Sequence, residues 1–235
     1  MRTLCLGLAV VASAGCSRPP LGEFCPDLSE GELVITEIRG PQTGGDNRGQ
    51  WFEVYNASDR AVDLRGLRIE FYNLQGARPA PARPILVRAE AFSAQPGQYV
   101  TFGHHDPAVL PDFVDYTFIN DYFGTPSLDA DELLALLELG LEPEDFEDRL
   151  PKDLERGGRI DLVACDVLID RVRYTSLPSE GTLSFDGDLE PDAEDNDQPE
   201  NFCTDEAEEV LEPGEPRNFI GLPGSPQEEN PACVK

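Results

Sequence analysis

Short runs of alternating apolar and polar residues recur along the chain, and residues that favour turns separate them. The clearest run is ELVITEIRG at 32–40, where β-branched residues are common and Gly40 and Pro41 end the run. This length and composition predict a buried β-strand. By the same pattern we expect further strands at 51–56, 61–64, 67–72, 98–103, 159–164, 167–174 and 181–185.

Turn-forming residues stand between these expected strands. The Asn and Asp side chains of NASD at 56–59 favour a turn because they can bond their own backbone, and Pro96 and Gly97 indicate another turn. Cys165 and Asp166 lie at the turn of an expected hairpin. Many short strands separated by turns are typical of an all-β sandwich.

The hydrophobic period changes between residues 129 and 156. Leucines crowd the segment DADELLALLELG, in which Asp129 and Glu132 have the spacing of a helix capping box. Pro143 favours the start of a second short helix. We therefore expect a short helical insertion on the β scaffold.

Residues 104–127 combine prolines with aromatic residues and predict a long ordered loop or short edge strands. Aromatic rings beside polar Asn120 and Asp121 suit stacking against a glycan. The alternative is that the rings pack in the core beneath the helical insertion. The candidate glycan platform consists of Tyr116, Phe118, Tyr122 and Phe123.

The N-terminal segment MRTLCLGLAVVASAGC has the layout of a secretory signal, with one positive charge, a short apolar stretch and small residues before Cys16. The stretch is shorter than the roughly 20 residues that span a bilayer. We expect residues 1–15 to be the signal peptide and 16–31 a Pro-containing tether. No later apolar run predicts a transmembrane helix.

The sequence Ser13-Ala14-Gly15-Cys16 resembles the lipobox of bacterial lipoproteins, although Ser13 stands where Leu is usual. In that family the peptide is cut before the Cys, which is then acylated. The resemblance implies a lipid anchor at Cys16, and Ser17 after it implies the outer membrane. The alternative is an ordinary cleaved signal in which Cys16 has no role.

Acidic residues dominate the charge, with 46 Asp and Glu against 18 Lys and Arg and a formal net charge of −28. Such a chain is repelled by phosphate backbones, so binding of nucleic acid through a basic face is excluded. Cations, basic proteins and neutral glycans remain as partners. The other interpretation is that the charge only keeps the chain soluble.

The segment DGDLEPDAEDND at 186–197 places five aspartates close together, and hard oxygen ligands at short spacing suit Ca²⁺. It lacks the sixth-position Gly and twelfth-position Glu of an EF-hand loop. A solvated acidic loop is the alternative. The candidate calcium ligands are Asp186, Asp188, Asp192, Asp195 and Asp197, and no other cofactor is expected.

Four of the six cysteines remain after the signal peptide and Cys16 are set aside. An even number in an exported chain implies disulfides, and four cysteines allow three pairings. The spacings do not fit a zinc site. The four are Cys25, Cys165, Cys203 and Cys233.

Catalysis has little support in the sequence. The chain has two histidines, His104 and His105, and adjacent residues on an extended segment point apart. No G-x-S-x-G motif accompanies them. We expect no enzyme, and a hydrolase using one of these histidines is the remote alternative.

The segments LVITEI, QWFEVYNASDRAVDLRGLRIEF, PGQYVTFG and GGRIDLVACDVLIDRVRY together resemble the lamin-tail domain family. The resemblance covers Leu33 to Phe185, and the segments 196–203 and 221–233 are similar to the ends of secreted bacterial members. It implies an immunoglobulin-like sandwich without catalytic residues. In such a sandwich the first strand can lie parallel beside the last, which implies the pairs Cys25–Cys165 and Cys203–Cys233.

We therefore expect a lamin-tail-like sandwich at 32–185 and an irregular acidic tail at 186–235, which is either disordered or wrapped on the sandwich and pinned by a disulfide. The expected function is that of a non-catalytic envelope lipoprotein for adhesion, scaffolding or ligand binding. The alternative is a calcium- or glycan-dependent binding subunit of an envelope complex.

Overall fold

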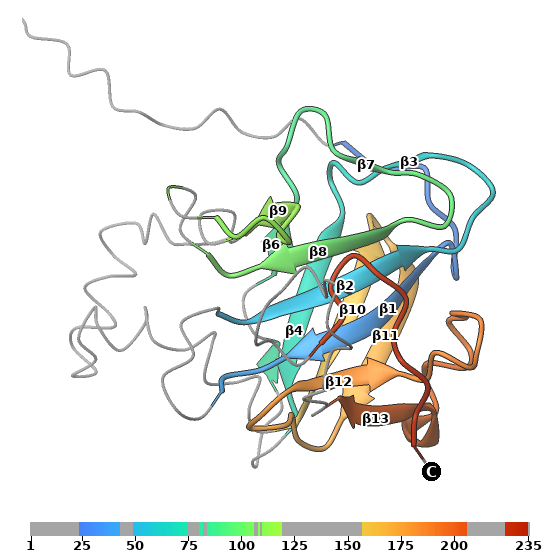
Figure 1. The fold of residues 1–235 in the computed structure, drawn as a ribbon. Helices are drawn as coiled ribbons and strands as arrows, with labels where there is room; N and C mark the ends of the chain where they lie inside the picture. Colours follow the sequence, from blue (N-terminus) through green and yellow to red (C-terminus); the bar gives the residue numbers. More distant parts are fainter. Residues whose placement is uncertain are drawn as a thin grey trace, which may run out of the picture.

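The computed structural model places two β-sheets face to face (Figure 1). It describes residues 24–42, 49–74, 80–81, 84–105, 108, 110–118, 157–205 and 224–234. The expected signal peptide, Cys16 and the expected helical insertion lie outside these ranges. Within the ranges, no helix has the length and apolar character needed to cross a bilayer.

The first sheet has six strands in the order β13-β12-β1-β2-β8-β9. Neighbours are antiparallel, apart from β8 and β9, which are parallel. The strands are β1 Leu33–Arg39, β2 Trp51–Asn56, β8 Tyr99–Gly103, β9 Tyr116–Thr117, β12 Thr182–Phe185 and β13 Phe202–Asp205.

The second sheet has five strands in the order β11-β10-β4-β5, with β6 also paired to β4. A separate ribbon of two strands joins β3 and β7. The strands are β3 Val62–Asp63, β4 Arg68–Asn73, β5 Ala80–Pro81, β6 Ile85–Leu86, β7 Ser93–Ala94, β10 Gly158–Ala164 and β11 Val167–Tyr174. A 3-10 turn, Pro199–Asn201, precedes β13.

Apolar side chains from both sheets form the core, as the alternating pattern predicts. Phe52 of β2 stacks on Phe102 of β8 with ring centroids 5.1 Å apart, and meets Phe71 of β4 edge-on at 5.8 Å. Such aromatic pairs add to the free energy gained by burying apolar area. The prediction of an all-β sandwich is confirmed.

A bulge in β1 changes which face its side chains occupy. The register with β2 shifts between Ile35 and Glu37. Ile35 and Ile38 belong to the core, while Glu37 lies opposite Glu53 on the outer face of the sheet. An extra residue in one strand has this effect because side chains alternate with a period of two.

The sheet extends beyond the expected end of the sandwich at residue 185. Strand β13 pairs with β12 from Phe185↔Phe202 to Thr182↔Asp205. Of the two expectations for the tail, the described parts therefore show the wrapped one. Residues 224–234 cross the outer face of the same sheet (Figure 1).

Both predicted disulfides are present, Cys25–Cys165 with Cα atoms 5.6 Å apart and Cys203–Cys233 with Cα atoms 5.8 Å apart. The parallel pairing expected for the first strand is wrong, because β1 is antiparallel to both β2 and β12. Cys25 reaches Cys165 because the segment before β1 follows β11, where the Gly31 amide donates to the Ile169 carbonyl at 2.8 Å.

Candidate functional site

An acidic cavity of about 410 Å³ lies beside strand β11. Three parts of the chain form its wall: the segment before β1, strand β11 and the loop 190–198. The wall carries five carboxyl groups, one guanidinium group and the aliphatic side chains of Leu168 and Ala193. The lining residues are Glu30, Gly31, Leu168, Ile169, Asp170, Arg171, Asp192, Ala193, Glu194 and Asp197.

Turn chemistry shapes the loop that forms the acidic side of the cavity. Asp192 Oδ1 accepts hydrogen bonds from the amides of Glu194 at 2.8 Å and Asp195 at 3.3 Å. The Asn196 amide donates to the Asp192 carbonyl at 2.9 Å. An Asp side chain that bonds the backbone two or three residues later favours a compact turn. The turn places Asp192 and Glu194 at the cavity.

The Asn196 side chain ties this loop to both sheets. Its Nδ2 donates to the Ile35 carbonyl at 3.1 Å and to Asp170 Oδ2 at 2.8 Å. Asn196 has an exposed fraction of 2%. Because Ile35 is in β1 and Asp170 is in β11, one buried amide fixes the loop against two strands of the sandwich.

Asp170 is the buried carboxyl of the cavity wall, with an exposed fraction of 3%. Its Oδ2 accepts from the Ile35 amide at 2.6 Å and from Asn196. Its Oδ1 is buried and has no hydrogen-bond partner of normal geometry among the described residues. Burial raises the pKa of Asp170 to about 7, although the donors from Ile35, Asn196 and the Arg171 amide favour the ionised form.

Arg171 supplies the basic group of the lining, but its charge is already compensated. Its Nε and Nη2 donate to the two oxygens of Asp161 at 2.9 and 2.7 Å. This bond to Asp161 raises the pKa of Arg171. A two-point bond of this kind also fixes the plane of the guanidinium group. The cavity is therefore acidic in net charge.

The structure divides the five aspartates of the candidate calcium loop. Asp192 and Asp197 line the cavity, whereas Asp186 is buried elsewhere and accepts from the Cys233 amide at 2.9 Å. Asp188 and Asp195 are exposed and are not part of the wall. Among the described residues, no group of three or more His, Cys, Asp or Glu side chains is arranged to hold a metal ion.

Glu30, Asp170 and Glu194 belong to this site but were not predicted from the sequence. A carboxyl in the middle of the apolar strand VLIDRVRY was the available signal for Asp170, because a buried charged group normally has a specific partner. No signal connected residue 30 with residues 170 and 194, since the contact depends on the tertiary fold.

Two of the four rings of the candidate glycan platform belong to the core. Tyr116 and Phe118 are buried, and Tyr116 stacks on Phe92 with centroids 5.2 Å apart. The Tyr116 hydroxyl accepts from the Arg88 amide at 2.9 Å. These two rings match the core-packing alternative, whereas Tyr122 and Phe123 lie outside the described residues.

The two histidines pack against aromatic rings. His104 lies 5.7 Å from Phe118 and His105 lies 6.1 Å from Phe113, measured between ring centroids. Burial lowers the pKa of His104, and the neighbouring His105 lowers it further.

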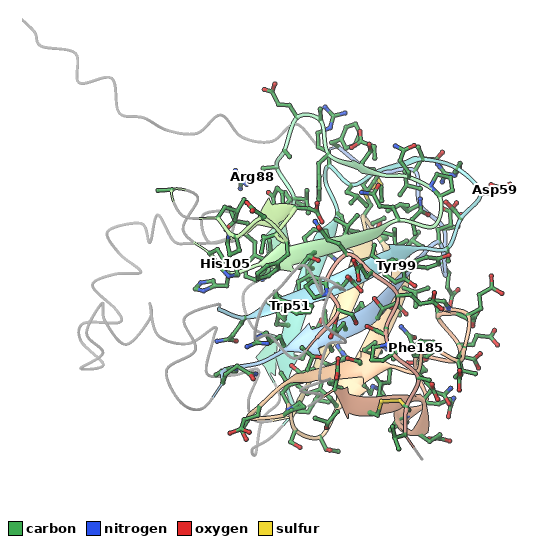
Figure 2. All side chains as sticks on the ribbon, viewed as in Figure 1. Trp51, Asp59, Arg88, Tyr99, His105 and Phe185 are labelled. Carbon is green, nitrogen blue, oxygen red and sulfur yellow. A yellow bond between two sulfur atoms is a disulfide. The ribbon has the colours of Figure 1, made fainter. Side chains whose placement is uncertain are left out.

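A second polar feature lies on the outer face of the six-stranded sheet, on the side where Trp51 is labelled in Figure 2. Glu37 and Glu53 face each other across β1 and β2, and both are fully buried beneath residues 224–234. Glu37 accepts from the hydroxyls of Thr182 and Ser184 and from the Ser225 amide. We call Glu37 and Glu53 the carboxyl pair.

The covering segment 224–234 is in close contact with the sheet. The Gln227 amide donates to Glu53 Oε2 at 2.5 Å, and Asn230 Nδ2 donates to the Thr36 carbonyl at 2.9 Å. Gly224 has φ +118°, and a Cβ there would lie 3.0 Å from Glu37 Oε1. Only glycine fits this backbone conformation and this approach. The carboxyl pair thus holds the C-terminal segment in place.

No protein-family model matches this chain, and no curated protein matches it significantly. The inference of function therefore rests on the residues of the chain itself.

Proposed function

We propose that this chain is an exported, membrane-anchored β-sandwich that binds a ligand without transforming it, and that the acidic cavity is its binding site. The observation that carries the proposal is the cavity itself. Its volume of about 410 Å³ is that of a small-ligand site, which is roughly 300–1,000 Å³. Its wall is held by the buried side chains of Asp170 and Asn196 rather than by a free loop.

Export and anchoring are supported by the N-terminal segment and by the cysteines. Disulfides persist in oxidising compartments, and the described part of the chain contains two. The lipobox resemblance at 13–16 implies a lipid on Cys16. Several acyl chains on one cysteine give a stable anchor, whereas a single chain binds a membrane only marginally.

The lamin-tail resemblance is part of the same proposal. The segments that carry it form the strands β1, β2, β3, β8, β10 and β11 and most of β4. Family members of this type are non-catalytic sandwiches, which agrees with a binding function. The identity of the ligand in the cavity would then decide whether the protein serves adhesion or scaffolding within the envelope.

A thermal unfolding experiment tests the cavity as the binding site. The mature chain in detergent is unfolded with and without calcium chloride, spermidine or a lysine-containing peptide. A ligand at a hundredfold excess over Kd stabilises the native state by about 2.7 kcal/mol, which corresponds to a rise of roughly 5–10 °C in Tm for a domain of this size. We expect a rise with at least one of the three cations.

The cavity variant Asp192→Asn/Glu194→Gln/Asp197→Asn should abolish this rise in Tm. Its matched control is Asp59→Asn/Glu90→Gln/Asp112→Asn, which removes the same number of exposed carboxylates elsewhere. Figure 2 labels Asp59 in the loop between β2 and β3, and Asp59, Glu90 and Asp112 are not among the residues that line the cavity. No rise with any of the three cations would contradict the proposed function.

Calcium-dependent binding is the second candidate function, and one observation favours it. Asp192 and Asp197, two of the candidate calcium ligands, line the same cavity. If calcium is the ligand, chelation should lower the Tm of the mature chain, and calcium should restore it. A Tm that is unaffected by both calcium and chelator would reject this candidate.

A further inference from the structure

We propose that the acidic cavity receives an alkylammonium or guanidinium group on a flexible apolar stem, as carried by a lysine or arginine side chain. This inference rests on the proposed function and names the ligand class of that site. Four properties of the cavity carry it: its volume, the distribution of its carboxyls, its aliphatic wall and the environment of Asp170.

The volume exceeds what a single ion requires. One water molecule occupies about 30 Å³ in the liquid, so a cavity of about 410 Å³ holds an organic group together with bridging waters. The space is open enough for a stem of several methylenes to enter.

The five carboxyls come from three separate segments of the chain. Glu30 precedes β1, Asp170 is in β11, and the other three are in the loop 190–198. An ammonium group has three N–H donors and a guanidinium group has five, which point in several directions. Charge-assisted bonds to carboxylates on different sides of a cavity suit such a donor.

The remaining wall is aliphatic and lies beside the acids. Leu168 and Ala193 contribute apolar surface to the lining, whereas the Ile169 side chain belongs to the core. Lysine and arginine bury their methylene stems along such surface while the charged end meets polar groups. A wall that combines apolar and acidic surface therefore matches both parts of a basic side chain.

Asp170 provides an independent indication of a missing donor. It is 3% exposed, and its Oδ1 has no hydrogen-bond partner of normal geometry within the described part of the chain. Buried polar atoms are normally hydrogen-bonded, and each exception requires an explanation. The Arg171 amide lies near this carboxylate without that geometry, and the Arg171 guanidinium donates to Asp161, so an N–H of a ligand would supply the bond that this oxygen lacks.

Calorimetric titration of the mature chain tests the ligand class. Four probes are titrated: a short peptide with two lysines, a control peptide in which norleucine replaces both lysines, spermidine, and calcium chloride. All titrations are done at about 0.15 M salt, where screening reduces unspecific electrostatic attraction. We expect the lysine peptide to bind and the norleucine peptide not to bind. Binding of spermidine alone would assign the site to free polyamines rather than to polypeptides.

The two triple variants locate the binding and control for net charge. Asp192→Asn/Glu194→Gln/Asp197→Asn should weaken the lysine peptide at least tenfold, whereas Asp59→Asn/Glu90→Gln/Asp112→Asn should leave its Kd within twofold of the parent. Equal weakening by both variants would overturn the inference, because the peptide would then respond to net charge alone.

The outcomes separate this inference from the proposed function. Calcium binding without binding of the lysine peptide or spermidine would overturn the ligand class and leave the proposed function standing. Absence of binding by all probes would overturn both. A further readout is the Asp170 carboxyl in NMR: its pKa should fall from about 7 when the peptide binds, because a nearby cation favours the ionised form.

Discussion

At the scale of single residues, the carboxyl pair makes stability depend on pH. Burial raises the pKa of Glu37 to about 7, and burial together with the neighbouring Glu37 raises the pKa of Glu53 well above its ordinary value. The charged groups that face the pair from other elements are Asp205 on β13 and Asp115 before β9, and both raise these pKa values further.

The direction in which the free energy of unfolding changes with pH follows from proton linkage. A carboxyl whose pKa is higher in the folded state than in the unfolded chain contributes stability below the unfolded pKa of 4.5, and loses it as the pH rises through about 7. We predict that the free energy of unfolding falls between pH 5 and pH 8, by on the order of 3 kcal/mol for a shift of this size.

The variant Glu37→Gln checks this prediction by removing one ionisable group while keeping an oxygen for its hydroxyl donors. Asp170 has a raised pKa of the same sign, so the relevant quantity is the difference in pH slope between variant and parent. Chemical denaturation should give a shallower slope for Glu37→Gln, and the exposed control Glu90→Gln should follow the parent. Parallel slopes for all three proteins would contradict the prediction.

At the scale of elements, the C-terminal segment 224–234 depends on the bond between Cys203 and Cys233, which lie 30 residues apart. Removing a disulfide that closes a loop of this length costs about 3–4 kcal/mol in the chain-entropy model. We predict such a loss of stability for Cys203→Ser/Cys233→Ser, measured by chemical denaturation. Amide hydrogen exchange should become faster at Ser225 and Gln227.

The control for this prediction is the facing sheet. The β10–β11 hairpin belongs to this sheet, and its ladder runs from the pair Gly158–Tyr174 to the turn. Neither cysteine of the Cys203–Cys233 disulfide is part of that ladder. Its amides should keep their protection in the double variant at moderate denaturant. Equal loss of protection in both regions would mean that the segment is not a separate unit of stability.

The same elements show how far the sequence predicts the fold. Strands β1, β2, β10 and β11 follow from alternating β-branched residues, and this local pattern is strong. Strand β13, with sequence FCTD, escapes prediction because it is short and lies in an acidic tail. Its stability comes from pairing with β12, which no local pattern contains.

The candidate site was harder to predict for the same physical reason. Asp192 and Asp197 stand in an acidic run, so the sequence marks them as possible ligands. Their partners Glu30 and Asp170 join them only because Asn196 fixes the loop against β1 and β11. The bulge before Glu37 is also invisible in the sequence, and it decides that Glu37 faces outward beside Glu53 rather than into the core.

At the scale of the whole molecule, the proposed anchor determines where the acidic cavity operates. A net charge of −28 repels an anionic membrane surface, so the proposed attachment relies on a lipid and not on the surface of the sandwich. We predict that the full chain, expressed in a bacterium with labelled palmitate, incorporates the label, and that Cys16→Ser loses it and moves to the soluble fraction.

The chain offers a matched control for this last prediction. Cys5 lies inside the segment that would be removed, so Cys5→Ser should keep both the label and the membrane fraction. An unlabelled parent would favour the ordinary cleaved signal instead. Retention of label by Cys16→Ser would place the lipid on another residue. Because several acyl chains hold a protein far more firmly than one, loss of the single Cys16 sulfur should release nearly all of the protein.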